Sequence, residues 1–170
     1  MRLIFSALAL SLAAAPAFAF EPGAYAAIDA GRASISSQYA DNSGDITLGA
    51  ALGYQYTSNL GFEFYTRSLS LDPFRGAFAP TGYYPDQHYG VAVLATAHLD
   101  DHFRAYGRVG IGRTSMKPNR SGLDNHDQTD PIIGVGVGYA FNRNWSIQLE
   151  GSYLTKSEVS LITAGVRWQF

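Results

Sequence analysis

Serine, histidine and carboxylate side chains are the first residues to test for chemistry, because nucleophilic catalysis needs a hydroxyl within reach of a histidine that a carboxylate orients. Glu150 and Ser152 share one face of a run of alternating residues, and His88 and His98 lie on an earlier run. These are the seventh and the fourth such runs of the chain, so they are not neighbours in its order, and His98 lies beside a tight turn. We therefore expect no catalytic residues and no enzymatic activity.

A second group of side chains offers oxygen and imidazole ligands within one polar segment: Asp124, His126, Asp127 and Asp130. Their spacing does not match a calcium-binding loop. The chain also has Cys 0, which excludes a thiolate nucleophile, a disulfide and a cysteine-based metal site. We interpret this segment as a solvated loop and expect neither a bound metal nor a cofactor.

The charge composition excludes a nucleic-acid partner. Lys+Arg 12 against Asp+Glu 14 gives a formal net charge of -2, whereas nucleic-acid binding needs basic residues clustered on one face. Charged residues make up 15% of the chain, compared with about 25% in ordinary soluble domains. Glycine, tyrosine and phenylalanine are numerous instead, at 18, 11 and 10 residues. The surface of the folded chain must therefore be largely uncharged.

The first 19 residues have the pattern of a secretory signal peptide. A single Arg2 precedes an apolar stretch, and the segment ends in the small-x-small sequence Ala17-Phe18-Ala19. A membrane-spanning helix would need about 20 apolar residues, and Pro16 interrupts this stretch. The sequence predicts cleavage after Ala19, which leaves residues 20–170 as one exported domain.

Beyond residue 20, apolar and small or polar residues alternate with a period of two, which indicates β-strands. Short turns beginning at Thr57, Asp100 and Asn142 each join two such runs. An opening strand around Tyr25 to Ser34 and a closing strand from Val159 to Phe170 bring the number to eight. The connections on the other side are longer and polar, over residues 35–44, 70–87 and 114–130, with a short link over 154–158. This arrangement is typical of an up-and-down barrel.

The face of the strands that carries the small residues distinguishes a soluble barrel from a membrane barrel. A soluble barrel such as a lipocalin has its apolar face inside and needs charged residues outside. Here the face opposite the large apolar residues is mostly glycine, alanine, threonine and serine, which suits a narrow lumen. The large apolar face ends near the short turns in an aromatic girdle. The sequence therefore predicts an all-β fold, an eight-stranded antiparallel up-and-down transmembrane β-barrel, which leaves no strand edge unpaired in hydrocarbon.

The last eight residues resemble the signal by which the barrel assembly machinery recognises outer-membrane proteins. Its polar, glycine, aromatic and terminal positions correspond to Thr163, Gly165, Trp168 and Phe170. Together with the runs at 105–110 and 134–141, the chain resembles the OmpA-like and OmpX-like eight-stranded outer-membrane barrel superfamily. The resemblance covers all of residues 20–170 and implies a location in the outer membrane of a Gram-negative bacterium. Because the sequence stops at Phe170, we expect the barrel domain only, without the periplasmic domain of OmpA.

A set of charged residues falls on the lumen side of the strands. With three acids facing four bases, we expect a polar network that pairs across the lumen, since buried charges are tolerated only when paired. The set is Asp29, Glu63, Arg67, Arg104, Arg108, Glu150 and Arg167. In the superfamily such internal ion pairs plug the barrel. A small ion-conducting channel is the alternative, and a lipid A-modifying enzyme is a third hypothesis. The enzyme hypothesis is weakened because none of the four histidines begins the His-x-Ser motif of the deacylases.

The loop over residues 70–87 has surplus aromatic residues beside an arginine, the types that commonly form contact hot spots. They are Phe74, Arg75, Phe78, Tyr83 and Tyr84. These side chains could contact a ligand on a host or other cell surface, cover the barrel mouth, or touch lipopolysaccharide and outer-membrane lipid. The expected function is envelope integrity or surface interaction and adhesion through the extracellular loops.

Overall fold

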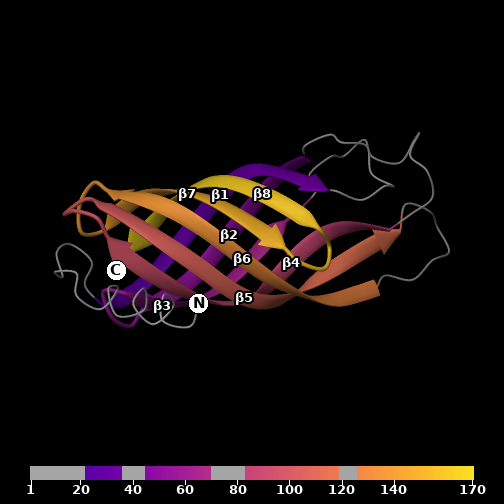
Figure 1. The fold of residues 1–170 in the computed structure, drawn as a ribbon, viewed down its shortest axis with the longest axis horizontal. Coiled ribbons are helices and arrows are strands. Elements are labelled where there is room, and N and C mark those ends of the chain that lie inside the picture. The colour runs from indigo at the N-terminus through magenta and orange to yellow at the C-terminus, as the bar shows by residue number, and fades with distance from the viewer. Residues whose placement is uncertain (1–21, 36–44, 70–82, 119–125) are drawn as a thin grey trace, which may run out of the picture.

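The computed structural model describes residues 22–35, 45–69, 83–118 and 126–170, which form a closed barrel (Figure 1). Its strands are β1 (Gly23–Ile35), β2 (Asp45–Gln55), β3 (Leu60–Ser68), β4 (Tyr83–His98), β5 (Phe103–Pro118), β6 (His126–Ala140), β7 (Trp145–Leu154) and β8 (Val159–Gln169). Each strand pairs antiparallel with the next, and β1 also pairs with β8 from Tyr25↔Gln169 to Ile35↔Val159. The predicted eight-stranded antiparallel barrel is confirmed.

Within the described residues, no helix is long and apolar enough to cross a membrane.

Three short turns close one end of the barrel, called here the turn end, and they are built alike. In each turn, the side-chain oxygen of the first residue accepts hydrogen bonds from the backbone N–H groups two and three residues later, as in Asx and Ser/Thr turns. The acceptors are Thr57, Asp100 and Asn142, at N···O distances of 2.7–3.3 Å. The predicted turn positions are therefore confirmed, and the opposite end is called the loop end.

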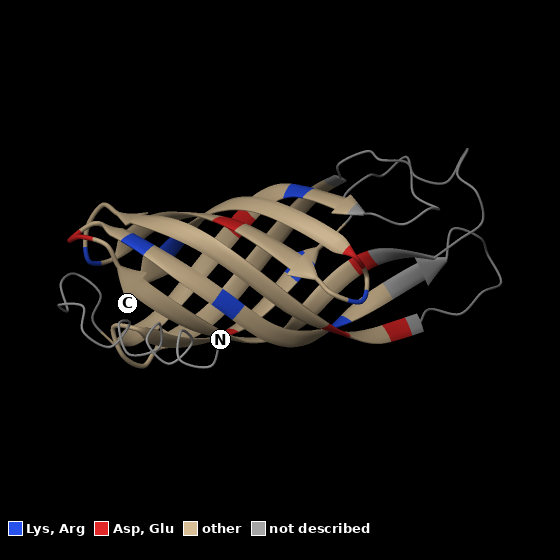
Figure 2. Ribbon diagram, viewed as in Figure 1, with Lys and Arg blue, Asp and Glu red and all other residues tan. Residues whose placement is uncertain are grey.

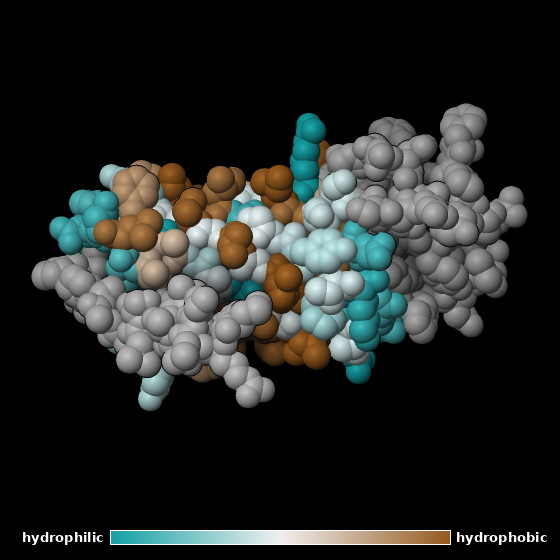
Figure 3. Space-filling model, viewed as in Figure 1, coloured by the Kyte–Doolittle hydropathy of each residue, from teal (hydrophilic) through white to brown (hydrophobic). Residues whose placement is uncertain are grey.

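The outer surface of the barrel is apolar, as a lipid-facing wall must be. Large side chains point away from the lumen, with Val135 72% and Ile28 67% exposed. Figure 3 shows brown, hydrophobic groups along the described wall, and Figure 2 shows long stretches of the wall without a charged residue. At the turn end the aromatic groups touch one another: the Trp168 ring lies 6.0 Å from Trp145 and 4.2 Å from Phe170 between ring centroids.

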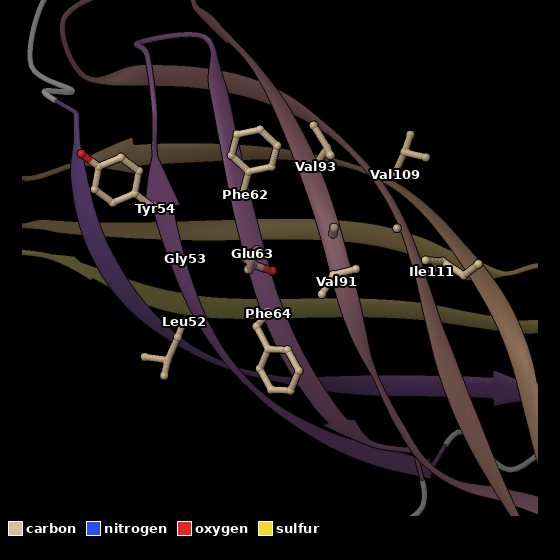
Figure 4. A pocket seen from close by; sticks show the side chains of 12 residues that line it. Leu52, Gly53, Tyr54, Phe62, Glu63, Phe64, Val91, Val93, Val109 and Ile111 are labelled. Atoms are coloured by element: carbon tan, nitrogen blue, oxygen red, sulfur yellow. The ribbon is translucent and has the colours of Figure 1, made fainter.

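Part of this outer wall is hollowed between β2, β3, β4 and β5. Figure 4 shows aromatic and aliphatic side chains standing around this hollow, among them Tyr54, Phe62, Phe64 and Val91. Tyr54 and Phe62 are directly paired across β2 and β3, and both are about half exposed. The apolar residues therefore face out of the barrel, as the sequence predicts.

The strands at the loop end are longer than the sequence indicates. The predicted loop over 70–87 ends early because Tyr83 and Tyr84 already belong to β4, where they pair with Pro118 and Lys117 of β5. The predicted loop over 114–130 shrinks in the same way, because β5 continues to Pro118 and β6 begins at His126. Backbone pairing continues beyond the apolar part of these strands, where the alternation that identifies a strand no longer appears. The predicted signal peptide, Phe74, Arg75, Phe78 and Asp124 lie outside the described residues.

Candidate functional site in the lumen

Five charged side chains meet at mid-depth in the lumen, and they are called here the ion cluster: Asp29, Glu63, Arg67, Arg108 and Glu150. Arg67 Nη2 lies 2.9 Å from Glu150 Oε1 and 3.8 Å from Asp29 Oδ2. Arg108 forms ion pairs with both glutamates. Its Nε lies 3.0 Å from Glu150 Oε2, and its Nη1 contacts Glu63 Oε1. Glu150 therefore joins the two arginines, and the cluster is continuous across the barrel.

The ion cluster is drawn from the odd-numbered strands alone. Asp29 lies on β1, Glu63 and Arg67 on β3, Arg108 on β5 and Glu150 on β7. At several paired positions the even-numbered strands carry glycine: Asp29 faces Gly49 and Gly165, and Glu150 faces Gly136. On β4, however, Arg67 faces His88 and Arg108 faces Leu94. Small residues on alternate strands leave the width that the long side chains need.

Two tyrosines support the carboxylates in the same way on opposite sides of the lumen. Tyr25 of β1 donates to Glu63 Oε2 at 3.0 Å, and Tyr106 of β5 donates to Glu150 Oε2 at 3.1 Å. Each ring lies over a glycine of the next strand, because a Cβ at Gly53 or Gly136 would overlap the ring. The tyrosine, glycine and glutamate of β1–β3 thus correspond to those of β5–β7, and Arg108 connects the two sets.

The electrostatics of the ion cluster follow from its burial. The arginine and glutamate side chains of the cluster are at most 5% exposed, so water stabilises neither the positive nor the negative charges. Removing one member of a buried pair usually costs about 3–5 kcal/mol, because the other charge stays buried without a partner. Two further contacts add to the network: Arg67 Nη1 donates to Ser152 Oγ at 2.9 Å, and the Arg108 guanidinium lies 5.6 Å from the Tyr65 ring centroid.

The other two predicted arginines lie nearer the turn end and have different partners. Arg104 Nη2 donates to Ser146 Oγ at 3.2 Å. Arg167 Nη2 donates to two neutral amide oxygens, Gln55 Oε1 at 3.0 Å and Gln169 Oε1 at 3.2 Å. Its guanidinium carbon also lies 3.5 Å from the centroid of the Tyr25 ring. The structure therefore divides the seven predicted lumen charges into a cluster of five and a separate pair.

A buried chain of hydrogen bonds lies on the loop-end side of the ion cluster, and the sequence analysis missed it. Tyr65 Oη is 2.8 Å from His88 Nε2, His88 Nδ1 is 2.9 Å from Thr114 Oγ1, and Thr114 donates to Asp130 Oδ2 at 3.2 Å. Asp130 also accepts from the backbone N–H groups of residues 156 and 157. All donors can then point toward the carboxylate, with Nδ1 of His88 protonated. The alternation of lumen-facing residues in β4, β5 and β6 could have revealed this chain. It was overlooked because residues 114–130 are predicted to be a loop.

These contacts do not form a triad. Both ring nitrogens of His88 are taken by Tyr65 and Thr114, and Ser152 accepts from Arg67. Among the described residues, no group of three or more histidine, aspartate or glutamate side chains could hold a metal ion.

The residues of the predicted assembly signal also have structural contacts. Thr163 is buried in the lumen, and a Cβ at Gly165 would overlap Asp29. Trp168 and Phe170 lie in the aromatic group at the turn end, and the Phe170 N–H donates to Ala24 O at 3.0 Å. Recognition by the assembly machinery stays a prediction.

Comparison with known proteins identifies what this barrel is similar to. A family model described as "Outer membrane protein beta-barrel domain" matches residues 5–170. Outer membrane protein A of Serratia marcescens is 29% identical over 139 residues, which are 72% of this chain but only 38% of that protein. Outer membrane protein X of Escherichia coli strain K12 is 27% identical over 92 residues, which are 52% of this chain and 54% of that protein. The chain thus spans less than two thirds of the length of each relative.

A solved structure agrees with these sequence relatives. The N-terminal β-barrel domain of Pseudomonas aeruginosa OprF has a TM-score of 0.62 with 16% sequence identity, covering 88% of this chain and all of that domain, 100%. At this identity the likeness concerns the fold alone.

Proposed function

Because the chain belongs to the outer membrane protein β-barrel domain family, and therefore lies in the bacterial outer membrane, we propose that it is a closed barrel that acts through its loop end at the cell surface. In this proposal the strands anchor the protein in the lipid, and the lumen is plugged rather than open. Adhesion or another surface interaction is then the task of the segments between the strands.

The observation that carries the proposal is the ion cluster. Glu150 joins Arg67 and Arg108 across the middle of the lumen, and Glu63 and Asp29 complete the layer from two further strands. An ion that crosses the barrel would have to displace these paired charges. Sheet closure alone would be consistent with either a plug or a pore, so the support for the plug comes from the paired charges.

A layer of apolar side chains on the loop-end side supports the same proposal. Ile132 of β6, Leu154 of β7, and Val159 and Leu161 of β8 are at most 1% exposed. Apolar groups in the lumen offer a passing ion no replacement for its water shell. The plug therefore combines an ion-paired layer with an apolar one.

Planar-bilayer recording tests the closed lumen. The folded wild-type protein should show no defined conductance steps, whereas Glu150→Ala should allow leakage by unlinking Arg67 from Arg108. Asp101→Ala, at an exposed turn position, is the matched control and should behave as the wild type. Defined, reproducible steps in the wild type would contradict the plug and support the small-channel alternative.

Attachment assays test the surface role. Replacing Phe74, Phe78, Tyr83 and Tyr84 together with serine should abolish the attachment of expressing bacteria to animal-cell monolayers, because these residues are the predicted contact groups. A preserved mobility difference between boiled and unboiled protein on SDS gels would show that the variant still folds. Unchanged attachment of a folded variant would contradict the proposed role of these residues.

A further inference from the structure

A buried carboxylate holds the turn between β7 and β8 in place. Asp130 of β6 is fully buried. Its Oδ1 accepts from the backbone N–H of Lys156 at 2.8 Å, and its Oδ2 accepts from that of Ser157 at 3.0 Å. Glu158 in the same turn has a φ of 53°, a left-handed conformation that is unfavourable for a residue with a Cβ. The bonds from Asp130 therefore stabilise a strained turn, which exposes Lys156 and Glu158 at the loop end.

The same carboxylate ends the buried chain of Tyr65, His88 and Thr114, which come from three consecutive strands. Thr114 has a single hydroxyl hydrogen, which it donates to Asp130 Oδ2. Thr114 Oγ1 must then accept from Nδ1 of His88, and Nε2 of a neutral ring is left to accept from Tyr65. The charge on Asp130 thus sets the tautomer of a histidine two hydrogen bonds away.

His88 is held in the neutral form because Arg67 lies directly opposite it. The two residues pair across β3 and β4, and both are at most 2% exposed. A second positive charge beside a buried guanidinium is unfavourable. The group of the chain that can change its charge is therefore Asp130.

The chain has a second continuous arrangement when Asp130 is neutral. The O–H of a carboxylic acid donates to Thr114, the Thr114 hydroxyl donates to His88 Nδ1, and His88 Nε2–H donates to Tyr65 Oη. Each link keeps the same pair of heavy atoms and only hydrogens move, so the strands need not shift. The backbone N–H of Ser157, however, then faces an oxygen that has become a donor. The turn loses one of its two bonds to Asp130.

We propose that Tyr65, His88, Thr114 and Asp130 form an acid-sensitive switch that links the β7–β8 turn to the lumen. With Asp130 ionised, both turn bonds form and every hydrogen of the chain points toward the loop end. When Asp130 takes up a proton, the chain reverses and the turn is released from it at Ser157. Because the proposed function places surface contacts at the loop end, the reversal changes that surface in acid, and this consequence alone rests on the proposed function.

The surroundings of Asp130 determine how its charge responds to pH. Among the side chains that the structure describes, five charged or titratable ones face this part of the lumen or lie on the turn: Tyr65 and Arg67 of β3, His88 of β4, and Lys156 and Glu158. Lys156 and Glu158 are exposed and screened by water, whereas Arg67 is buried and acts on the chain directly.

Nuclear magnetic resonance of the isotope-labelled protein in detergent micelles tests the switch. Asp130→Asn imitates the neutral state, because the amide nitrogen can donate to Thr114 but cannot accept. The ¹⁵N resonances should identify His88 as the Nδ1–H tautomer in the wild type and as the Nε2–H tautomer in Asp130→Asn. Hydrogen exchange of the Ser157 backbone N–H should become about tenfold faster in the variant, while that of Lys156 keeps its acceptor. Asp127→Asn, at an exposed position of the same strand, is the matched control and should change neither.

Two results would overturn the proposal: an Nε2–H or doubly protonated His88 in the wild type, or an Nδ1–H tautomer that persists in Asp130→Asn. A preserved mobility difference between boiled and unboiled Asp130→Asn on SDS gels shows that the variant is folded.

A pH titration of the wild type does not depend on a variant. As the pH is lowered from about 7 to about 3, His88 should change from the Nδ1–H to the Nε2–H tautomer, and Ser157 should lose protection over the same interval. A tautomer that stays Nδ1–H throughout, or a ring that becomes doubly protonated, would contradict the acid-sensitive switch. Neither measurement involves conductance or attachment, so its failure is distinguishable from a failure of the proposed surface role.

Discussion

The middle and the turn end of the lumen bury arginine in different ways. At mid-depth, Arg67 and Arg108 face three carboxylates, and every ion pair of the cluster crosses between strands. At the turn end, Arg167 is held by neutral amides and by the face of Tyr25. Residues of one type on the same face of the sheet therefore have different roles. Arg67 and Arg108 link strands across the barrel through ion pairs, whereas Arg167 contacts neutral groups at the turn end.

The largest effect should come from removing one arginine from each region. Arg108→Met leaves Glu63 and Glu150 buried without their shared partner, and should lower the free energy of unfolding by about 3–5 kcal/mol. Arg167→Met removes two hydrogen bonds to neutral amides but leaves no opposite charge buried without a partner, and should therefore cost less than Arg108→Met. Urea unfolding of both variants in lipid vesicles measures the two losses.

The difference in unfolding free energy between Arg108→Met and Arg167→Met tests whether the two regions of the lumen stabilise arginine differently. Equal losses would show that a carboxylate partner makes no difference to a buried arginine in this lumen. Arg32→Met, in which an exposed arginine is replaced in the same way, controls for the removal of a positive charge and should change the free energy of unfolding little.

A second prediction concerns the glycines that make room at mid-depth. Gly136→Ala places a Cβ where the Tyr106 ring lies, and should lower the free energy of unfolding by about 1–3 kcal/mol through overpacking. Gly151→Ala is the matched control on β7, because a Cβ there meets nothing within 4 Å. That control should gain about 0.5–1 kcal/mol from the reduced entropy of the unfolded chain. A destabilised Gly151→Ala together with a neutral Gly136→Ala would contradict this account of the small residues.

A third prediction concerns the chain of hydrogen bonds toward the loop end, which contains no ion pair between its members. Thr114→Val keeps the shape of the side chain but removes the hydroxyl that joins His88 to Asp130. The loss should be about 1–3 kcal/mol, since two buried polar groups lose a partner. Thr129→Val, exposed on the outer face of β6, is the control and should have little effect. Denaturant unfolding of both variants checks this, and similar losses would show that the buried chain contributes nothing specific.

The sequence predicts the barrel well because a transmembrane strand has to alternate. One face must be apolar for lipid, and the short turns at Thr57, Asp100 and Asn142 fix where each strand starts its alternation. The same period assigns Glu63 and Arg108 to the lumen. It does not reveal which charges meet, because that depends on the stagger between strands and on side-chain length. Arg167 therefore looks equivalent to Arg108 in the sequence, although their partners in the structure differ.

The part of the lumen that the sequence analysis missed lies where the constraint of the lipid ends. Near the loop end the outward residues no longer need to be apolar, so the alternation fades while the backbone pairing continues. The sequence pattern places Thr114 and Asp130 in a loop for this reason, although the pairing of β5 with β6 sets Thr114 opposite Gln128 and Asp130 opposite Gly112. Pairing beyond the apolar belt needs knowledge of the partner strand, which a single strand's pattern does not contain.

The smallest predicted effect sharpens the comparison within the turn end itself. The Asp100 carboxylate accepts from the backbone N–H groups of Phe103 and His102, both at 2.7 Å, and these bonds lower the pKa of Asp100. In the next turn Asn142 accepts the same two bonds with a neutral amide. The turn end therefore offers one acceptor that titrates and one of the same geometry that does not.

The pH dependence follows from the direction of the shift. A lowered pKa in the folded state means that the carboxylate's contribution is fully present above the unfolded-state value of about 3.9, and is lost as the pH falls through the lower folded-state value. Asp100→Asn copies Asn142 and removes this titration, while every other titratable group is common to the two proteins. The stability advantage of the wild type over Asp100→Asn should therefore shrink between about pH 5 and pH 3, as measured by urea unfolding at each pH. A difference that stays constant over this interval would mean that the backbone N–H groups of the turn do not distinguish a carboxylate from an amide.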